Sequence, residues 1–425
     1  MNTMTDTTDD RISARAKEIA EREMATLLDN TTASAAMFER AKRSMPGGVA
    51  SSFQLGDPYP IYLAGGKGAE VTDVDGRTYY DFHNGFGSMA VGHANPIVAD
   101  AIERAARTGT HFAVTTEAAV ALAEELCRRF RVDQVRMTNS GTESTGTCIR
   151  VARAATGRDV ICKIEGSYHG HVDQLMYSVL PGADVMGGRD EPATVPKSKG
   201  VPAGMAQWIR VVPFNDAEAF ERLLQAEGEQ IAAIIMEPVM MNIGIVLPRP
   251  GYLEAMRKLC TQYGVVLIFD EVKCGATIAA GGAAERFGVQ PDLASWAKAI
   301  GGGTAIGAFG GKAEIMDQIN QGATPGHLQR QPPLGRSRSR DAHPGPHAAG
   351  LRALRIARAS AVGRHERVDR RQRDPGPHHR PRLQGVRVLP PGAVDELPGL
   401  PRDEHRPLPR LLSVDDQPGC LHDPG

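Results

Sequence analysis

Two apolar segments, each ending in an acidic residue, constrain this chain more than any other feature. The run IAAIIM at 231–236 leads into Glu237, and the run GVVLIF at 264–269 leads into Asp270. Unbroken apolar runs of this length are typical of parallel strands that are buried on both faces. Ligand sites in open α/β sheets lie outside the carboxyl ends of such strands, so we expect both carboxylates at one edge of a sheet.

The surrounding sequence alternates between strand and helix patterns. Candidate strands occupy 134–138, 159–164, 208–212, 231–236, 265–269 and 306–309, and candidate helices occupy 142–156, 216–227 and 251–263. This alternation predicts a mainly parallel sheet covered by helices on both faces. Before it, 9–28 reads as an amphipathic helix, and Asp75-Gly76 is a hairpin turn signal.

A lysine completes the pattern, because Lys298 follows an apolar segment and precedes three glycines at 301–303. A lysine with a lowered pKa can form a Schiff base with an aldehyde such as pyridoxal phosphate (PLP), whose ring nitrogen needs an acidic partner. Alone, an acid such as Asp270 is more often a strand-end cap or part of an ion pair, and an isolated lysine is usually solvated. Together, in this order, they favour PLP chemistry.

These segments resemble the class III PLP-dependent aminotransferases, and within that family the glutamate-1-semialdehyde 2,1-aminomutase subfamily, from about residue 38 to about residue 320. The resemblance implies the α/β fold of PLP-dependent transferases of fold type I. It also implies PLP as cofactor, small amine and carbonyl substrates, and a homodimer. The implied reaction moves an amino group through a Schiff base on Lys298, either between two substrates or, in an aminomutase, within one.

The resemblance assigns the PLP phosphate to a segment that follows a strand and opens a helix, namely Ser140, Gly141 and Thr142. Small residues at a helix N-terminus let backbone N–H groups approach an anion, although by itself such a segment is usually only a helix cap. His169 and His171 have a spacing that a metal could use, but no third ligand accompanies them, and we expect no metal site.

The remaining assignments concern the cofactor ring, and they too come from the resemblance. Tyr168 would stack on the ring, and Val272 would pack against its other face. Asp270 would pair with the ring nitrogen, and Lys298 would act as Schiff-base lysine and general base. Two further residues would lie near the cofactor ring or the substrate: Glu237 and Asn242.

Charge and composition exclude several classes of protein. The formal net charge of -1 favours neither a nucleic-acid partner nor a membrane surface, and no apolar run approaches the length of a membrane span. The N-terminal MNTMTDTTDDR lacks the pattern of a signal peptide. The 6 cysteines show no metal-type spacing, so we expect a reduced, cytoplasmic protein.

One departure from the family concerns the substrate. After the Pro-Gly-Gly turn at 46–48, the aminomutases carry an arginine that binds a substrate carboxylate, and Gln54 stands in its place here. Glutamine cannot form a charged, bidentate clamp. This favours a related transaminase over an enzyme for glutamate-1-semialdehyde itself.

The second departure is the C-terminal hundred residues. From 326 to 425 the chain has 18 arginines and 15 prolines but no lysine, phenylalanine, tryptophan or tyrosine. Such a composition is unsuited to a packed domain. We therefore expect an N-terminal helix and small strand region at 1–90, a large PLP-binding α/β domain at 91–320, and an aberrant, disordered Arg/Pro-rich tail at 321–425 in place of the C-terminal small domain.

A frameshift near 320–327 would account for this tail. About thirty residues after its lysine, the family has a Thr-x-x-Gly-Asn-Pro segment whose threonine binds the PLP phosphate of the partner subunit. Here 327–333 reads HLQRQPP, and with one choice of codons a one-base shift turns it into Thr-Ser-Asn-Gly-Asn-Pro-Leu. The chain would then be the inactive product of a damaged gene. The alternative is a genuine basic tail that binds nucleic acid or a partner.

Sequencing the genomic locus tests the frameshift. We expect a neighbouring frame that encodes Thr-x-x-Gly-Asn-Pro opposite residues 327–333 and continues with lysine and aromatic codons. One uninterrupted frame, with that motif absent from the other two, would contradict the hypothesis.

Overall fold

The computed structural model describes residues 6–320, so the tail expected at 321–425 and the frameshift motif lie outside the described residues. Within this range the chain forms two compact units, one made of residues up to 65 with 70–82, the other of 66–69 with the residues from 83 onward. The domain boundary that we expect at residue 90 stays a prediction. In residues 6–320, no helix has both the length and the apolar content needed to cross a bilayer.

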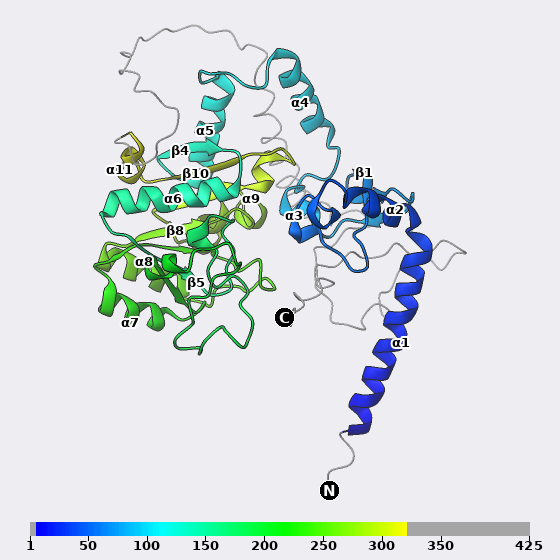
Figure 1. Ribbon diagram of the computed structural model, residues 1–425. Coiled ribbons are helices and arrows are strands. Elements are labelled where there is room, and N and C mark those ends of the chain that lie inside the picture. The colour runs from blue at the N-terminus through cyan, green and yellow to red at the C-terminus, as the bar shows by residue number, and fades with distance from the viewer. Residues whose placement is uncertain (1–5, 321–425) are drawn as a thin grey trace, which may run out of the picture. The chain divides into compact units, whose positions relative to one another are not determined.

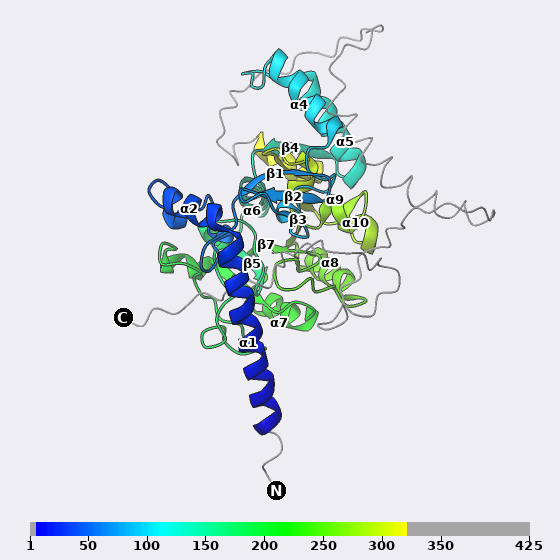
Figure 2. The ribbon, with the colours of Figure 1, turned by 90° about the vertical axis from the view of Figure 1, so that its right-hand side faces the viewer.

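The first unit combines two helices with a small antiparallel hairpin (Figure 2). Its elements are α1 Asp6–Asn30, α2 Thr32–Ala41, the short 3-10 turns η1 Pro46–Gly48 and η2 Ser52–Gln54, and the strands β1 Leu63–Lys67, β2 Glu70–Asp73 and β3 Thr78–Tyr80. The predicted turn at Asp75-Gly76 is present, with Gly76 at φ 82°. Asp75 also caps α2, because its carboxylate accepts hydrogen bonds from Ala33 N (2.6 Å) and Ser34 Oγ (2.8 Å).

Gln54, which stands where the family has an arginine, is engaged locally in this unit. Its side-chain oxygen accepts a hydrogen bond from Ser51 N (3.1 Å), and Ser51 Oγ accepts one from Phe53 N (3.4 Å). The pair forms a capping box around η2. The side chain of Gln54 therefore has a structural partner within its own turn.

The second unit is built on a seven-stranded sheet in the order β4-β10-β9-β8-β7-β5-β6. The strands are β4 Gln134–Thr138, β5 Val160–Ile164, β6 Ile209–Val212, β7 Ile231–Met236, β8 Val266–Asp270, β9 Leu293–Ala297 and β10 Gly307–Gly311. Only β10 runs antiparallel to its neighbours, and the pairs from β9 through β6 are parallel. The predicted mainly parallel sheet is confirmed, and β9 is a strand that the sequence pattern missed.

Helices cover both faces of this sheet (Figure 1). The helices of the unit are α3 Asn84–Gly87, α4 Pro96–Thr108, α5 Glu117–Phe130, α6 Gly141–Thr156, α7 Ala217–Glu227, α8 Tyr252–Tyr263, α9 Gly275–Ile278, α10 Gly282–Phe287 and α11 Ala313–Met316, with 3-10 turns η3 Asp173–Leu175, η4 Ala203–Trp208, η5 Lys298–Gly301 and η6 Asp317–Ile319. α6 and α11 pack on one face, while α5, α7 and α8 pack on the other. Both predicted layers are confirmed.

The two cores show why the strands read as continuous apolar runs. On β7, Ile234 packs into the core under α7 and α8, whereas Ile235 packs into the core under α6. Because successive side chains point to opposite faces, a strand covered on both sides needs apolar residues at every position. Parallel pairing of β5, β7 and β8 brings their carboxyl ends to one edge.

Replacement of Ile235 by alanine tests the central position of β7. Ile235 is 0% exposed, so we expect Ile235→Ala to lower the free energy of unfolding by about 2–5 kcal/mol. The matched change Ile102→Ala, at a residue 48% exposed on α4, should stay within about 0.5 kcal/mol. Urea unfolding followed by tryptophan fluorescence measures the free energy of unfolding of both variants. Equal losses would contradict the placement of Ile235 in the core.

Candidate active site

A cavity of about 160 Å³ lies where the strands end at this edge. Eight of the predicted site residues line it: Gly141, Thr142, Tyr168, Glu237, Asn242, Asp270, Val272 and Lys298. Ser140 does not line the cavity, but it is the N-cap of α6 and accepts a hydrogen bond from Glu143 N (3.2 Å). The structure thus brings together residues that are far apart in the sequence, while their roles stay predictions.

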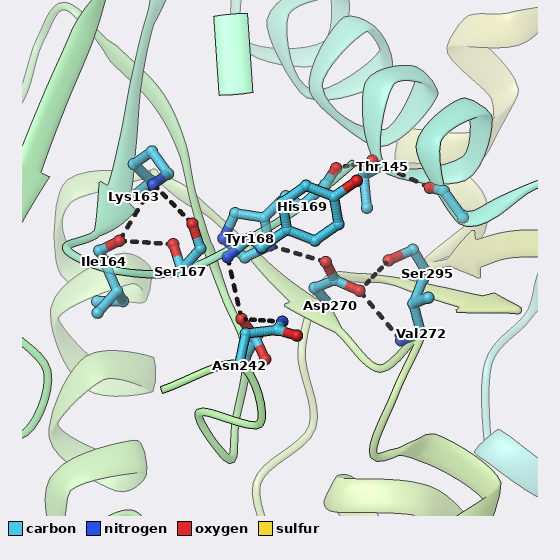
Figure 3. A network of polar contacts seen from close by, with 12 residues as sticks. Thr145, Lys163, Ile164, Ser167, Tyr168, His169, Asn242, Asp270, Val272 and Ser295 are labelled. Carbon is cyan, nitrogen blue, oxygen red and sulfur yellow. Dashed lines mark hydrogen bonds and ion pairs between the residues drawn. The ribbon is translucent and has the colours of Figure 1, made fainter. Parts of the chain in front are cut away.

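Asp270 ends β8 and is held by three hydrogen bonds (Figure 3). Its Oδ1 accepts from Val272 N (3.0 Å) and Ser295 Oγ (3.2 Å), and its Oδ2 lies 2.7 Å from His169 Nδ1. The carboxylate is only 4% exposed. A buried acid fixed from three sides presents its charge in one direction, as a partner for a cationic ring nitrogen requires.

Glu237 ends β7's apolar run and is fixed in the same way. Its Oε1 accepts hydrogen bonds from Tyr168 N (3.1 Å) and Asn242 Nδ2 (3.0 Å), and its Oε2 accepts one from Met241 N (2.9 Å). The carboxylate therefore sets the position of the segment after β5, which carries the aromatic ring. Asn242 is held beside it.

The N-terminus of α6 forms another part of the cavity wall. Within residues 6–320, the backbone N–H groups of Gly141 and Thr142 have no acceptor, as expected for the first turn of a helix. A Cβ atom added to Gly141 would lie 2.8 Å from Val272 Cγ1, so only glycine allows this close approach. Free N–H groups at a helix start suit a phosphate.

Lys298 follows β9 and has φ 52°, in the left-handed region that non-glycine residues rarely adopt. Its ammonium group has no hydrogen bond or ion pair to any residue in the described part of the chain. Burial, and then the charge of Lys273, lowers its pKa, while Asp270 and Glu237 oppose the shift. More of the amine is neutral at a given pH than in a solvated lysine, which favours nucleophilic attack on an aldehyde.

Three residues in or near the site escaped the sequence patterns. Lys163, inside the apolar run VICKI, is 0% exposed, and its Nζ donates to the carbonyls of Ile164 (3.3 Å), Ser167 (3.1 Å) and Tyr177 (2.7 Å). A charged residue within a buried strand was the available signal for it.

His169 and Lys273 are the other two. His169 lies beside Asp270, and its Nε2 is buried without a hydrogen-bond partner among the described residues. Lys273 lines the cavity three positions after Asp270. Each follows a predicted site residue in the sequence, but the sequence does not show whether its side chain points into the cavity.

Together these groups fit a flat, phosphorylated pyridine aldehyde. The α6 N-terminus offers donors to a phosphate, Asp270 offers an acceptor to a ring nitrogen, Tyr168 offers an aromatic face, and Lys298 offers a free amine. The fit rests on the shape and chemistry of the cavity wall.

Lys163 holds the segment that carries Tyr168 through hydrogen bonds to the carbonyls of Ser167 and Tyr177, and its protonation can be tested. Burial lowers the pKa of Lys163 to about 7, against the opposing charge of Glu237. At pH values between this folded-state pKa and the unfolded-state pKa near 10.5, Lys163 binds more protons in the unfolded chain than in the folded chain. The contribution of Lys163 to the free energy of unfolding therefore rises with pH in this range. We expect the urea midpoint of the wild type to rise relative to that of Lys163→Met from pH 7 to pH 10.

The two urea midpoints are read from unfolding curves at matched pH values. A constant difference across this range would show that Lys163 keeps its proton in the folded chain. The exposed residue Lys258 serves as the matched control, since Lys258→Met removes a solvated ammonium group.

The family model for aminotransferase class-III matches residues 54–329. A curated relative, the glutamate-1-semialdehyde 2,1-aminomutase of Prosthecochloris aestuarii, is 45% identical over 293 residues, which are 68% of this chain and 66% of the relative. The chain thus spans slightly less than two thirds of that relative's length.

Solved structures agree with the family match. An omega-transaminase from Sphaerobacter thermophilus is 36% identical, with a TM-score of 0.67, covering 79% of this chain and 76% of that one. A transaminase with PLP bound is 33% identical, with a TM-score of 0.66, covering 80% and 78% respectively. The likeness extends over most of the described residues.

Proposed function

The chain belongs to the class-III aminotransferase family and has the fold type I architecture of its PLP-dependent members, and from that premise we propose that it moves an amino group between an amine or amino acid and a carbonyl compound. The observation that carries this proposal is the free amine of Lys298, which shares one cavity with the fixed carboxylate of Asp270. The family uses PLP, and the cavity wall fits that cofactor.

PLP, when bound, supplies an aldehyde that carries the amino group and a ring that accepts electrons. Lys298 would hold the cofactor and then move the proton at the reacting carbon, because burial lowers its pKa and so raises the share of neutral amine above that of a solvated lysine. Asp270 would keep the ring nitrogen protonated. Tyr168 and Val272 would enclose the ring from its two faces.

The phosphate would bind at the start of α6, where the N–H groups of Gly141 and Thr142 are available and Ser140 shapes the turn. Glu237 and Asn242 would border the ring on the side of β7. We further propose that the intact enzyme works as a homodimer, as the family resemblance implies, and in the cytoplasm, as the small number of cysteines favours.

An aminomutase that rearranges one substrate is the second candidate, supported by the 45% identity to the Prosthecochloris enzyme. Gln54 argues against it, because a carboxylate clamp made by arginine is missing at that position. Dependence on a separate carbonyl acceptor distinguishes the two: a transaminase stalls without one, whereas an aminomutase does not.

Absorbance spectroscopy with added PLP tests the cofactor site. We expect the 425-residue chain to develop a visible band that Lys298→Ala lacks, and turnover to fall by about a hundredfold or more in the variant. Lys258→Ala, at an exposed lysine of α8, should behave like the wild type. Absence of a band in the wild type would mean that this polypeptide is not a working aminotransferase. That is the result expected of an inactive, frameshifted product.

A further inference from the structure

Lys273 puts a second ammonium group in the cavity that Lys298 lines. It lies between β8 and α9, and its Nζ donates to Met241 O and to Asn242 Oδ1, each at 3.3 Å. Both bonds are long and both acceptors are uncharged. They orient the ammonium group without neutralising its charge.

No anion of the protein itself is paired with this cation. Among residues 6–320, no carboxylate lies within ion-pair distance of Lys273 Nζ. The two acids of the cavity are engaged elsewhere, since Glu237 and Asp270 each make three hydrogen bonds to other groups. The cation is therefore free to meet an anion brought by a ligand.

The burial of Lys273 favours the binding of such an anion. Burial lowers the pKa of Lys273, and the charge of Glu237 opposes that shift only in part. A partly desolvated cation regains interaction energy when a carboxylate approaches it, and more so in a cavity than in water. The phosphate of the cofactor would have its own donors at α6, so the anion that meets Lys273 is either the ring oxygen of the cofactor or a group of the substrate.

We propose that Lys273 binds the carboxylate of the substrate, so that the site acts on amines and carbonyl compounds that carry a carboxylate beyond the reacting carbon. This inference rests on the proposed amino-group transfer.

Binding of butanoate, a carboxylate without an amine, tests the proposal without any turnover. Saturation-transfer NMR on the full chain, with and without PLP, should show binding to the wild type and to Lys258→Met. Lys273→Met should bind at least about tenfold more weakly, and Lys273→Arg should restore most of the affinity. Failure of butanoate to bind the wild type, or equal binding to Lys273→Met, would overturn the proposal.

A kinetic comparison adds a readout of specificity. The donors 3-aminobutanoate and isopropylamine differ by one carboxylate group. Lys273→Met should raise KM about tenfold or more for 3-aminobutanoate and change it less than about twofold for isopropylamine. An equal loss with both donors would show that Lys273 acts through Lys298 instead, and the proposal would fail.

A PLP titration separates the remaining outcomes. A Lys273→Met variant that loses PLP affinity as strongly as it loses butanoate would make Lys273 a ligand of the cofactor, which overturns the inference. A wild type without any PLP band would defeat the proposed function, yet the butanoate measurement would still decide the role of Lys273.

Discussion

The site depends on two buried carboxylates that are immobilised before any ligand arrives. Asp270 and Glu237 stand at the ends of adjacent parallel strands, and each is fixed by three hydrogen bonds. An unpaired acid at such depth would be costly, so these bonds stabilise the fold and orient the charges at the same time. The same donors include the backbone of Tyr168 and the ring of His169, and the carboxylates therefore also set the position of the segment after β5.

Much of this arrangement could be predicted from sequence, because buried parallel strands have a distinctive pattern. The apolar runs before Glu237 and Asp270 gave both the strands and the edge at which the acids meet. Strand β9, by contrast, was missed. Its sequence LASWA contains three small residues, and neither a long apolar run nor an alternation distinguishes it. Pairing with β8 on one side and β10 on the other, which a local pattern does not record, makes it a strand.

The cations could not be predicted as readily. Lys163 and Lys273 each lie within or beside a motif, but their roles depend on which backbone carbonyls surround the amine. The positions of these carbonyls depend on loops, and a local sequence pattern does not predict the conformation of a loop. The structure shows three lysines in three settings: Lys163 is enclosed by carbonyls, Lys273 lines the cavity and makes two long hydrogen bonds, and Lys298 lines it without a polar partner among the described residues.

The ring of His169 has a consequence for the hydrogen positions in this site. Nδ1 lies 2.7 Å from Asp270 Oδ2, while Nε2 is buried with no acceptor among the described residues. A proton on Nε2 would be a buried donor without a bond, so the favoured tautomer carries its hydrogen on Nδ1 and leaves a lone pair on Nε2. The imidazole then acts as a dipole that points its positive end at the acid. The hydrogen bond from Nδ1 therefore fixes the direction in which the carboxylate of Asp270 faces.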